Sequence, residues 1–141
     1  MKNQIKNSGM AMAIILFTCA FASLSFAQNK QVCEDIVAQI YNGINQRKAN
    51  HLTQYLSKDF SMAGQKGEIA LEIFPVYITS LKDNVADIKK FSEKQTDVLT
   101  LVYEAKFAEM GLKKSTFVFD KNNKLIKMDL LPTKVQHQKG Q

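Results

Sequence analysis

The sequence predicts an α+β protein in which N-terminal helices pack in a curved antiparallel sheet. Apolar residues recur at helical spacing between residues 33 and 81, and at every second position from residue 98 to residue 131. Helices followed by a run of strands are typical of this fold class. The chain shows no repeat and no change of composition, so we expect a single domain over residues 28–132 and a disordered tail over residues 133–141.

Three helices are predicted in the first half. The first carries one apolar stripe whose members lie one, three or four positions apart: Ile36, Val37, Ile40, Tyr41 and Ile44. A second helix is expected from Asn50, whose side chain can cap a helix N-terminus, to Phe60. After a short strand or loop at residues 61–67, a third helix is expected from Glu68 to Leu81, and Pro75 inside it predicts a kink or a restart.

Alternation of apolar and other residues predicts a meander of three strands in the second half. The apolar face of the first strand consists of Leu99, Leu101, Tyr103, Ala105 and Phe107. A turn at Met110 and Gly111 leads to a second strand that ends at Phe119, and a hairpin connection at residues 120–124 leads to a third strand at residues 125–131. Residues 87–94 fit a twisted edge strand, because Lys89 and Lys90 interrupt the pattern and lysine protects sheet edges.

The N-terminus has the three parts of an export signal. Lys2 and Lys6 form a positive region, an apolar stretch follows from Met10 to Ala22, and Ser25-Phe26-Ala27 offers small residues at the positions a signal peptidase reads. We therefore expect residues 1–27 to be a signal peptide, with cleavage after Ala27 and a periplasmic or secreted mature protein.

Two other interpretations of this segment fit less well. A retained membrane anchor needs about 20 mainly apolar residues, which is longer than the strongly apolar stretch here. Lipoprotein processing at Cys19 would require small residues before the cysteine, where Phe17 and Thr18 stand. Contact with a membrane is accordingly expected only through an uncleaved signal.

The charge of the chain does not point to nucleic acid. Loss of Lys2 and Lys6 leaves 17 basic against 13 acidic residues, so the net charge falls from +6 to +4. The lysines are dispersed along the sequence, and Arg47 is the only arginine, whereas nucleic-acid sites rely on clustered arginine and lysine. We interpret this charge as favouring solubility rather than polyanion binding.

Cysteine and histidine are too few for the common catalytic and metal sites. Cys33 is the only cysteine of the mature chain, so it has no intramolecular disulfide partner and is interpreted as a buried apolar residue rather than a reactive thiol. His51 and His137 have no ligand spacing with each other or with Cys33. The sequence predicts neither a metal nor another cofactor.

An acid/base site without histidine would need a tyrosine and a carboxylate in an apolar pocket. The four tyrosines are Tyr41, Tyr55, Tyr77 and Tyr103, and the candidate carboxylates are Asp59, Glu104 and Asp129. Strand parity turns Glu104 and Asp129 away from the apolar face, and core packing with the hydroxyl at a rim is the competing interpretation of the tyrosines. No catalytic residue is therefore assigned.

The order of elements and several short motifs resemble the nuclear transport factor 2-like superfamily over residues 33–132. The motifs are Ile40-Tyr41-Asn42-Gly43-Ile44-Asn45 with the segment from Asn50 to Phe60, then Phe117-Val118-Phe119-Asp120 and Lys124-Leu125-Ile126. The resemblance implies a cone formed by the sheet around the helices, whose open end can hold a small apolar ligand. Enzymes of this group that resemble steroid isomerases or polyketide cyclases use an aspartate with a tyrosine, or a histidine and aspartate pair, and those residues have no match here.

These observations favour an exported, non-catalytic module that binds a small apolar ligand or a protein. The predicted pocket is lined by large residues on inner faces: Tyr41, Tyr55, Phe60, Phe74, Tyr77, Tyr103 and Phe107. The alternative function is a small isomerase or lyase that uses a tyrosine and a carboxylate in this pocket. A homodimer through the outer sheet face is a third possibility, since a moderately apolar surface is expected from Thr100, Val102, Thr116 and Val118.

Overall fold

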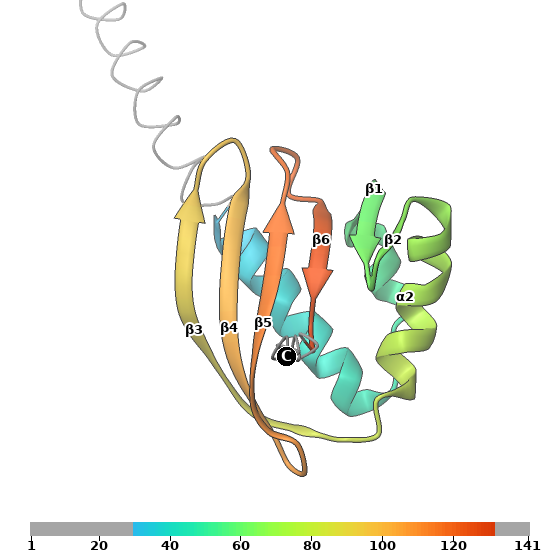
Figure 1. Ribbon diagram of the computed structural model, residues 1–141, viewed down its shortest axis with the longest axis vertical. Coiled ribbons are helices and arrows are strands. Elements are labelled where there is room, and N and C mark those ends of the chain that lie inside the picture. The colour runs from blue at the N-terminus through green and yellow to red at the C-terminus, as the bar shows by residue number, and fades with distance from the viewer. Residues whose placement is uncertain (1–29, 132–141) are drawn as a thin grey trace, which may run out of the picture. The chain divides into compact units, whose positions relative to one another are not determined.

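The computed structural model describes residues 30–131, in which helices pack against a six-stranded sheet. Figure 1 shows the first helix crossing behind the strands of this sheet. A helix over residues 30–46 is followed by the 3-10 helix η1 (Asn50–Tyr55), strands β1 (Leu56–Met62) and β2 (Gln65–Lys66), and helix α2 (Glu68–Ser80). Strands β3 (Val85–Gln95), β4 (Leu99–Phe107), β5 (Gly111–Phe119) and β6 (Leu125–Asp129) complete the chain. The predicted α+β class, with helices packed against a curved sheet, is confirmed.

The sheet is mixed, which corrects the expectation of a wholly antiparallel sheet. Its strand order is β2-β1-β6-β5-β4-β3, and every neighbouring pair is antiparallel except β1 with β6. The parallel pair is irregular, because Leu56 lies opposite Leu125 but Ser61 lies opposite Lys127. An advance of five residues along β1 corresponds to an advance of two along β6, and the last paired residue of β6 is Lys127, two residues before the strand ends.

The predicted second helix is wrong beyond Tyr55. Leu52, Leu56 and Phe60 are buried at intervals of four, and this interval satisfies both the helical period of 3.6 and the strand period of 2. Pairing with β2 and β6 decides the outcome, since the chain is extended from Leu56 onward. Asn50 does not cap the helix: the N-cap position is Ala49, which makes no side-chain cap.

The turn between the first helix and η1 depends on a close approach at Gly43. The Lys48 amide donates to the Gly43 carbonyl at 3.0 Å, and a Cβ at residue 43 would lie 2.6 Å from the Lys48 oxygen and 2.9 Å from Leu52 Cδ1. A side chain at this position would force the backbone apart. Glycine is thus required inside the motif that suggested the family.

Pro75 does not divide α2 into two helices, so the predicted restart is wrong. Residues 68–80 form one continuous helix whose buried positions, Ala70, Phe74 and Ile78, repeat every four residues. Burial of this stripe against the core stabilises the helix enough to tolerate the hydrogen bond that proline cannot donate. Ile69 and Val76 lie on its exposed side.

The three predicted strands of the second half are confirmed, except that β6 ends at Asp129, two residues before the predicted end. The predicted face of β4 is buried throughout, and Ser115, Phe117 and Phe119 are buried on β5. Asn123 has φ +60° in the connection at residues 120–124, as expected for this residue type. The edge strand is also confirmed, although β3 is longer than predicted and shifts its register near Phe91.

Two polar contacts fix the segment between α2 and β3. Asn45 donates from Nδ2 to the Val85 carbonyl at 3.0 Å and accepts from the Val85 amide at 2.7 Å. Arg47 donates to the carbonyls of Ile44 and Lys82. The start of the sheet's edge strand is thereby tied to the end of the first helix.

The predicted signal peptide and the predicted tail lie outside the described residues. Within residues 30–131, no helix has the length and apolar character needed to span a membrane. The limits of the predicted domain remain a prediction.

Candidate functional site

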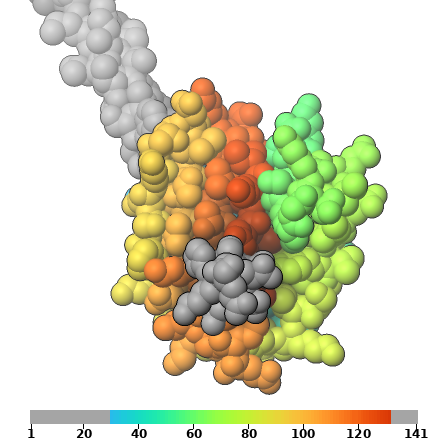
Figure 2. Space-filling view, in the orientation of Figure 1, coloured from blue at the N-terminus to red at the C-terminus, as the bar shows by residue number. Residues whose placement is uncertain are grey.

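A cleft lies where the β1–β2 hairpin separates from β6. It consists of two hollows that share Met62, Ala63, Met128 and Asp129. The outer hollow, of about 480 Å³, adds Ser61, Gly64, Gln65, Lys66 and Lys127; the inner hollow, of about 230 Å³, adds Tyr77, Leu130 and Leu131. In the space-filling view the surface is hollowed where the red atoms of β6 meet the green atoms of the hairpin (Figure 2).

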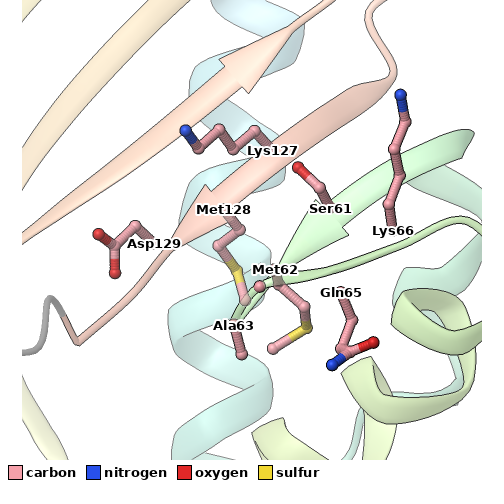
Figure 3. Close-up of a pocket in the computed structure, with 9 residues that line it drawn as sticks. Ser61, Met62, Ala63, Gln65, Lys66, Lys127, Met128 and Asp129 are labelled. Atoms are coloured by element: carbon pink, nitrogen blue, oxygen red, sulfur yellow. The ribbon is translucent and has the colours of Figure 1, made fainter.

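Sheet parity divides the walls of this cleft into an apolar and a polar side. Met62 and Met128 are almost fully buried, with 4% and 2% exposure. Lys127 and Asp129 occupy the alternate positions of β6, and Figure 3 shows their side chains directed away from the two methionines. Methionine is flexible and polarizable, so the buried side can adapt to apolar groups of different shape.

Tyr77 brings a hydroxyl from α2 to the inner hollow. Burial raises the pKa of Tyr77 above its usual value of 10, and the negative charge of Asp129 raises it further. The hydroxyl is therefore protonated at neutral pH and is available as a hydrogen-bond donor. Leu130 and Leu131 supply apolar surface beside it.

The tip of the hairpin is strained. Ala63 has φ +50° and Gly64 has φ +76°, and a left-handed conformation costs a residue with a Cβ roughly 1–2 kcal/mol. Asparagine is the usual residue at the first of these positions, and its side chain is larger than that of alanine. Ala63 lines both hollows, so its small side chain leaves room in the cleft at a cost in backbone strain.

The seven residues of the predicted pocket all belong to the hydrophobic core or pack against it: Tyr41, Phe60, Phe74, Tyr103 and Phe107 are buried, and Tyr55 and Tyr77 are partly buried. The rings of Phe60 and Phe74 pack edge to face at 5.6 Å, and those of Tyr41 and Tyr103 each meet Phe117, at 5.8 and 6.1 Å. Tyr77 is the member that lines the cleft at β6. A ligand-binding role for the other six stays a prediction.

The Tyr41 hydroxyl is a buried polar group within this core. It makes no hydrogen bond within residues 30–131. Burial raises the pKa of Tyr41 to about 12, against a smaller lowering by the nearby Ser115 hydroxyl. The Ser115 hydroxyl donates its own hydrogen bond to the Leu130 carbonyl oxygen, at 2.7 Å. Among the described residues, Tyr41 therefore carries a buried hydroxyl whose polar neighbour is Ser115.

Glu104 and Asp129 lie on the outer sheet face, as strand parity predicts, but Asp129 also lines the cleft. Glu104 stands on the outer sheet face, opposite Lys89 and Lys114, and Asp59 is exposed on β1. Asp129 also points to the outer side, but it lies beyond the last pairing of β1 with β6, at the rim of the cleft that contains Tyr77. A tyrosine and a carboxylate thus meet at one hollow.

The described residues contain no group of three or more His, Cys, Asp and Glu side chains that could hold a metal ion. Cys33 is a buried free thiol beside the Asn123 side chain, with 3.7 Å between sulfur and oxygen. Burial raises the pKa of Cys33 to about 11, and the charges of Asp120 and Glu34 add to this. A thiol with this pKa is a poor nucleophile at neutral pH.

Sequence patterns did not identify the methionines, the lysines or Ala63 as parts of a site. Met62 and Met128 have the pattern of ordinary core residues, and 61 positions separate Lys66 from Lys127. The one local signal is the Ala63-Gly64 step, which marks a turn but gives no indication of a ligand.

The chain has distant structural likenesses. A putative polyketide cyclase from Xanthomonas campestris is 13% identical, with a TM-score of 0.48 over 74% of this chain and 93% of that chain. A protein from Sphaerobacter thermophilus is 13% identical, with a TM-score of 0.47 over 70% and 95%. An epoxide hydrolase/cyclase-like enzyme of pyran ring formation in salinomycin is 14% identical, with a TM-score of 0.45 over 74% and 92%.

No family model matches the sequence. No curated protein matches it either.

Proposed function

We propose that this chain is an exported, non-catalytic module of the nuclear transport factor 2-like type that binds a small apolar ligand in the cleft between the β1–β2 hairpin and β6. The observation that supports this function most directly is the inner hollow, which is lined by two buried methionines, two leucines and Tyr77. Ligand sites commonly combine mainly apolar walls with a few polar groups.

The family assignment rests on the sequence motifs and on the order of the elements. Gly43 stands at a close backbone approach inside the first motif, which gives that motif a structural reason. Export rests on the three-part pattern of residues 1–27. N-terminal sequencing of the mature protein from a periplasmic fraction tests this part, because cleavage after Ala27 leaves Gln28 as the first residue.

The size of the hollow limits the ligand. Drug-sized ligands fill roughly 300–1,000 Å³, whereas the inner hollow has about 230 Å³ and adjoins an outer one of about 480 Å³ that shares four of its lining residues. The ligand is therefore expected to place a small apolar group inside and its polar end toward the outer hollow. The protonated Tyr77 hydroxyl favours a hydrogen-bond acceptor on the ligand, such as a carbonyl oxygen.

Methionine methyl groups offer a direct test. Without residues 1–27 the chain contains Met62, Met110 and Met128, of which Met110 is exposed in the β4–β5 turn and serves as an internal control. With methionine methyl groups labelled with carbon-13, titration with acetophenone should shift the Met62 and Met128 signals saturably and leave Met110 in place. Equal shifts of all three signals would contradict the proposal.

The hydroxyl is tested with a matched pair of ligands and variants. Acetophenone should bind more tightly than ethylbenzene, which lacks the acceptor, and Tyr77→Phe should remove that preference. Val76→Ala, at an exposed position next to Tyr77, should retain it. A preference that survives in Tyr77→Phe would exclude Tyr77 as the donor.

A second candidate function is the small isomerase or lyase, and the observation that favours it is that Tyr77 and Asp129 line the same hollow. In that case Asp129 would remove a proton next to a carbonyl while Tyr77 donates a hydrogen bond to the carbonyl oxygen. The enzyme would then exchange the methyl protons of acetophenone for deuterium in D₂O faster than buffer does. Exchange at the same rate in Asp129→Asn would rule out this role for Asp129.

A further inference from the structure

One row of side chains crosses the outer face of all six strands. The pairings between neighbouring strands connect, in order, Lys94, Thr100, Val118, Lys127, Ser61 and Lys66. Residues paired directly across a ladder project from the same face of a sheet. The row therefore presents three lysines on one face, and no acidic residue belongs to it.

The spacing of the lysines follows from the sheet itself. Neighbouring strands lie about 4.8 Å apart, so Lys94 and Lys127, three strands apart, are separated by about 14 Å, and Lys127 and Lys66, two strands apart, by about 10 Å. The three lysines are exposed, while Thr100, Val118 and Ser61 are half-buried. These residues form a strip about 24 Å long. Its exposed lysine side chains project beyond shorter, half-buried side chains, two of which carry hydroxyl groups.

The end of this strip is the outer hollow of the cleft. Ser61, Lys66 and Lys127 belong both to the row and to the lining of the hollow, and Figure 3 shows the two lysine side chains extending from its two walls. Asp129 is the acidic residue of this lining, and it belongs to the neighbouring row, opposite Thr116. The row thus combines a charged strip with a depression that can take part of a bound polymer.

We infer that this row binds a linear acidic polysaccharide, that is, a chain of sugars that carries carboxylates at regular intervals. Lysine is a compact charge that suits carboxylates spaced along a flexible chain, and the Thr100 and Ser61 hydroxyls can hydrogen-bond to sugar hydroxyls. The strip is long enough to contact several sugar units at once. This surface shares the outer hollow with the small-ligand site, but its side chains point to the other side of the sheet from Met62 and Met128.

A single-stranded nucleic acid fits the row less well. Binding of that kind depends on aromatic side chains that stack on bases, and the row contains none. The single arginine of the chain, Arg47, is bonded to backbone carbonyls at the other end of β3, so it adds nothing to the strip. The row favours a polymer with charge and hydroxyl groups but without bases.

Affinity measurements with defined oligogalacturonates at low salt test the inference in the protein without residues 1–27. Each of Lys66→Gln, Lys94→Gln and Lys127→Gln should weaken binding roughly threefold, and the triple variant roughly 30-fold, as expected for exposed charge pairs that act independently. Binding to the unaltered protein should weaken as salt is added. A neutral dextran of equal length should not bind.

The matched control removes the same charge elsewhere. Lys48, Lys82 and Lys106 are exposed and lie outside the row, so their triple substitution to glutamine should change the affinity less than twofold. An equal loss in both triple variants would show unspecific attraction and overturn the inference. Tighter binding of an oligodeoxynucleotide of the same charge would overturn it too. The small-ligand site is tested with acetophenone, which carries no charge and does not need the lysines, so failure of one proposal is distinguishable from failure of the other.

Discussion

Removal of the Asp83 carboxylate should destabilise the domain more than its position in a short connection suggests. Asp83 is 9% exposed, and its two oxygens accept from the Glu109 amide at 3.0 and 3.0 Å and from the Met110 amide at 2.8 Å. Both donors belong to the turn that joins β4 to β5. The connection after α2 therefore holds that turn through one side chain.

The structure allows an estimate of the cost. Hydrogen bonds to charged groups contribute about 1.5–3 kcal/mol each, but bonds to one carboxylate are not additive and water can reach a turn. We expect Asp83→Ala to lower the free energy of unfolding by about 2–3 kcal/mol, which corresponds to roughly 10–20 °C in Tm for a domain of this size. Asp83→Asn keeps one acceptor oxygen and should cost about half as much.

Urea denaturation followed by circular dichroism measures this effect. Asp87→Ala is the matched control, because Asp87 is exposed on β3 and its removal should change stability by less than about 0.5 kcal/mol. If Asp83→Ala unfolds within 0.5 kcal/mol of the unaltered protein, the three hydrogen bonds do not stabilise the turn. Equal losses in both variants would mean that only the charge matters.

Two further predictions follow from buried ionisable groups. Because Cys33 is buried and its pKa is about 11, iodoacetamide at pH 8 should label it only in denaturant, and rapid labelling of the native protein would contradict this. Burial raises the pKa of Tyr41 and of Tyr103 to about 12, against an ordinary value of 10, so the unfolded chain loses these protons first as pH rises. The free energy of unfolding should therefore be constant with respect to these groups below pH 10 and fall between pH 10 and 12; an unchanged value in alkaline urea titrations would refute the assigned burial.

The sequence predicted those elements whose periodicity has one interpretation. Alternation from Leu99 to Phe107 extends over nine residues, which no helix can reproduce, and β4 matches it. The segment from Asn50 to Phe60 failed because its apolar residues lie four apart, an interval common to helix and strand. The parallel pairing of β1 with β6 could not be predicted either, since it joins residues that are 66 to 69 positions apart in the sequence.

The sequence predicted the residue types of the candidate site but not where in the fold they come together. Tyr77 was a candidate from the start, and a tyrosine near a carboxylate was a stated alternative. Strand parity placed Asp129 on the outer side of the sheet, which argued against a role beside a tyrosine of the core. The structure confirms that side. Tyr77 and Asp129 both line the hollow beyond the last pairing of β1 with β6, and the irregular register of that pair leaves no trace in the local pattern of either strand.

The same irregularity explains why the lysine row could not be inferred from composition. Lys66, Lys94 and Lys127 are 28 and 33 positions apart, and each stands in a segment of mixed charge, which favoured solubility as their role. Their alignment depends on five pairings, one of which is the shifted contact of Ser61 with Lys127. A shift of one residue in that contact would turn Lys127 to the opposite face relative to Lys66. The row and the predicted dimer surface share Thr100 and Val118, so a dimer through this face would cover the strip. Polymer binding and this mode of self-association should therefore compete, and oligogalacturonate should dissociate any dimer that sedimentation detects.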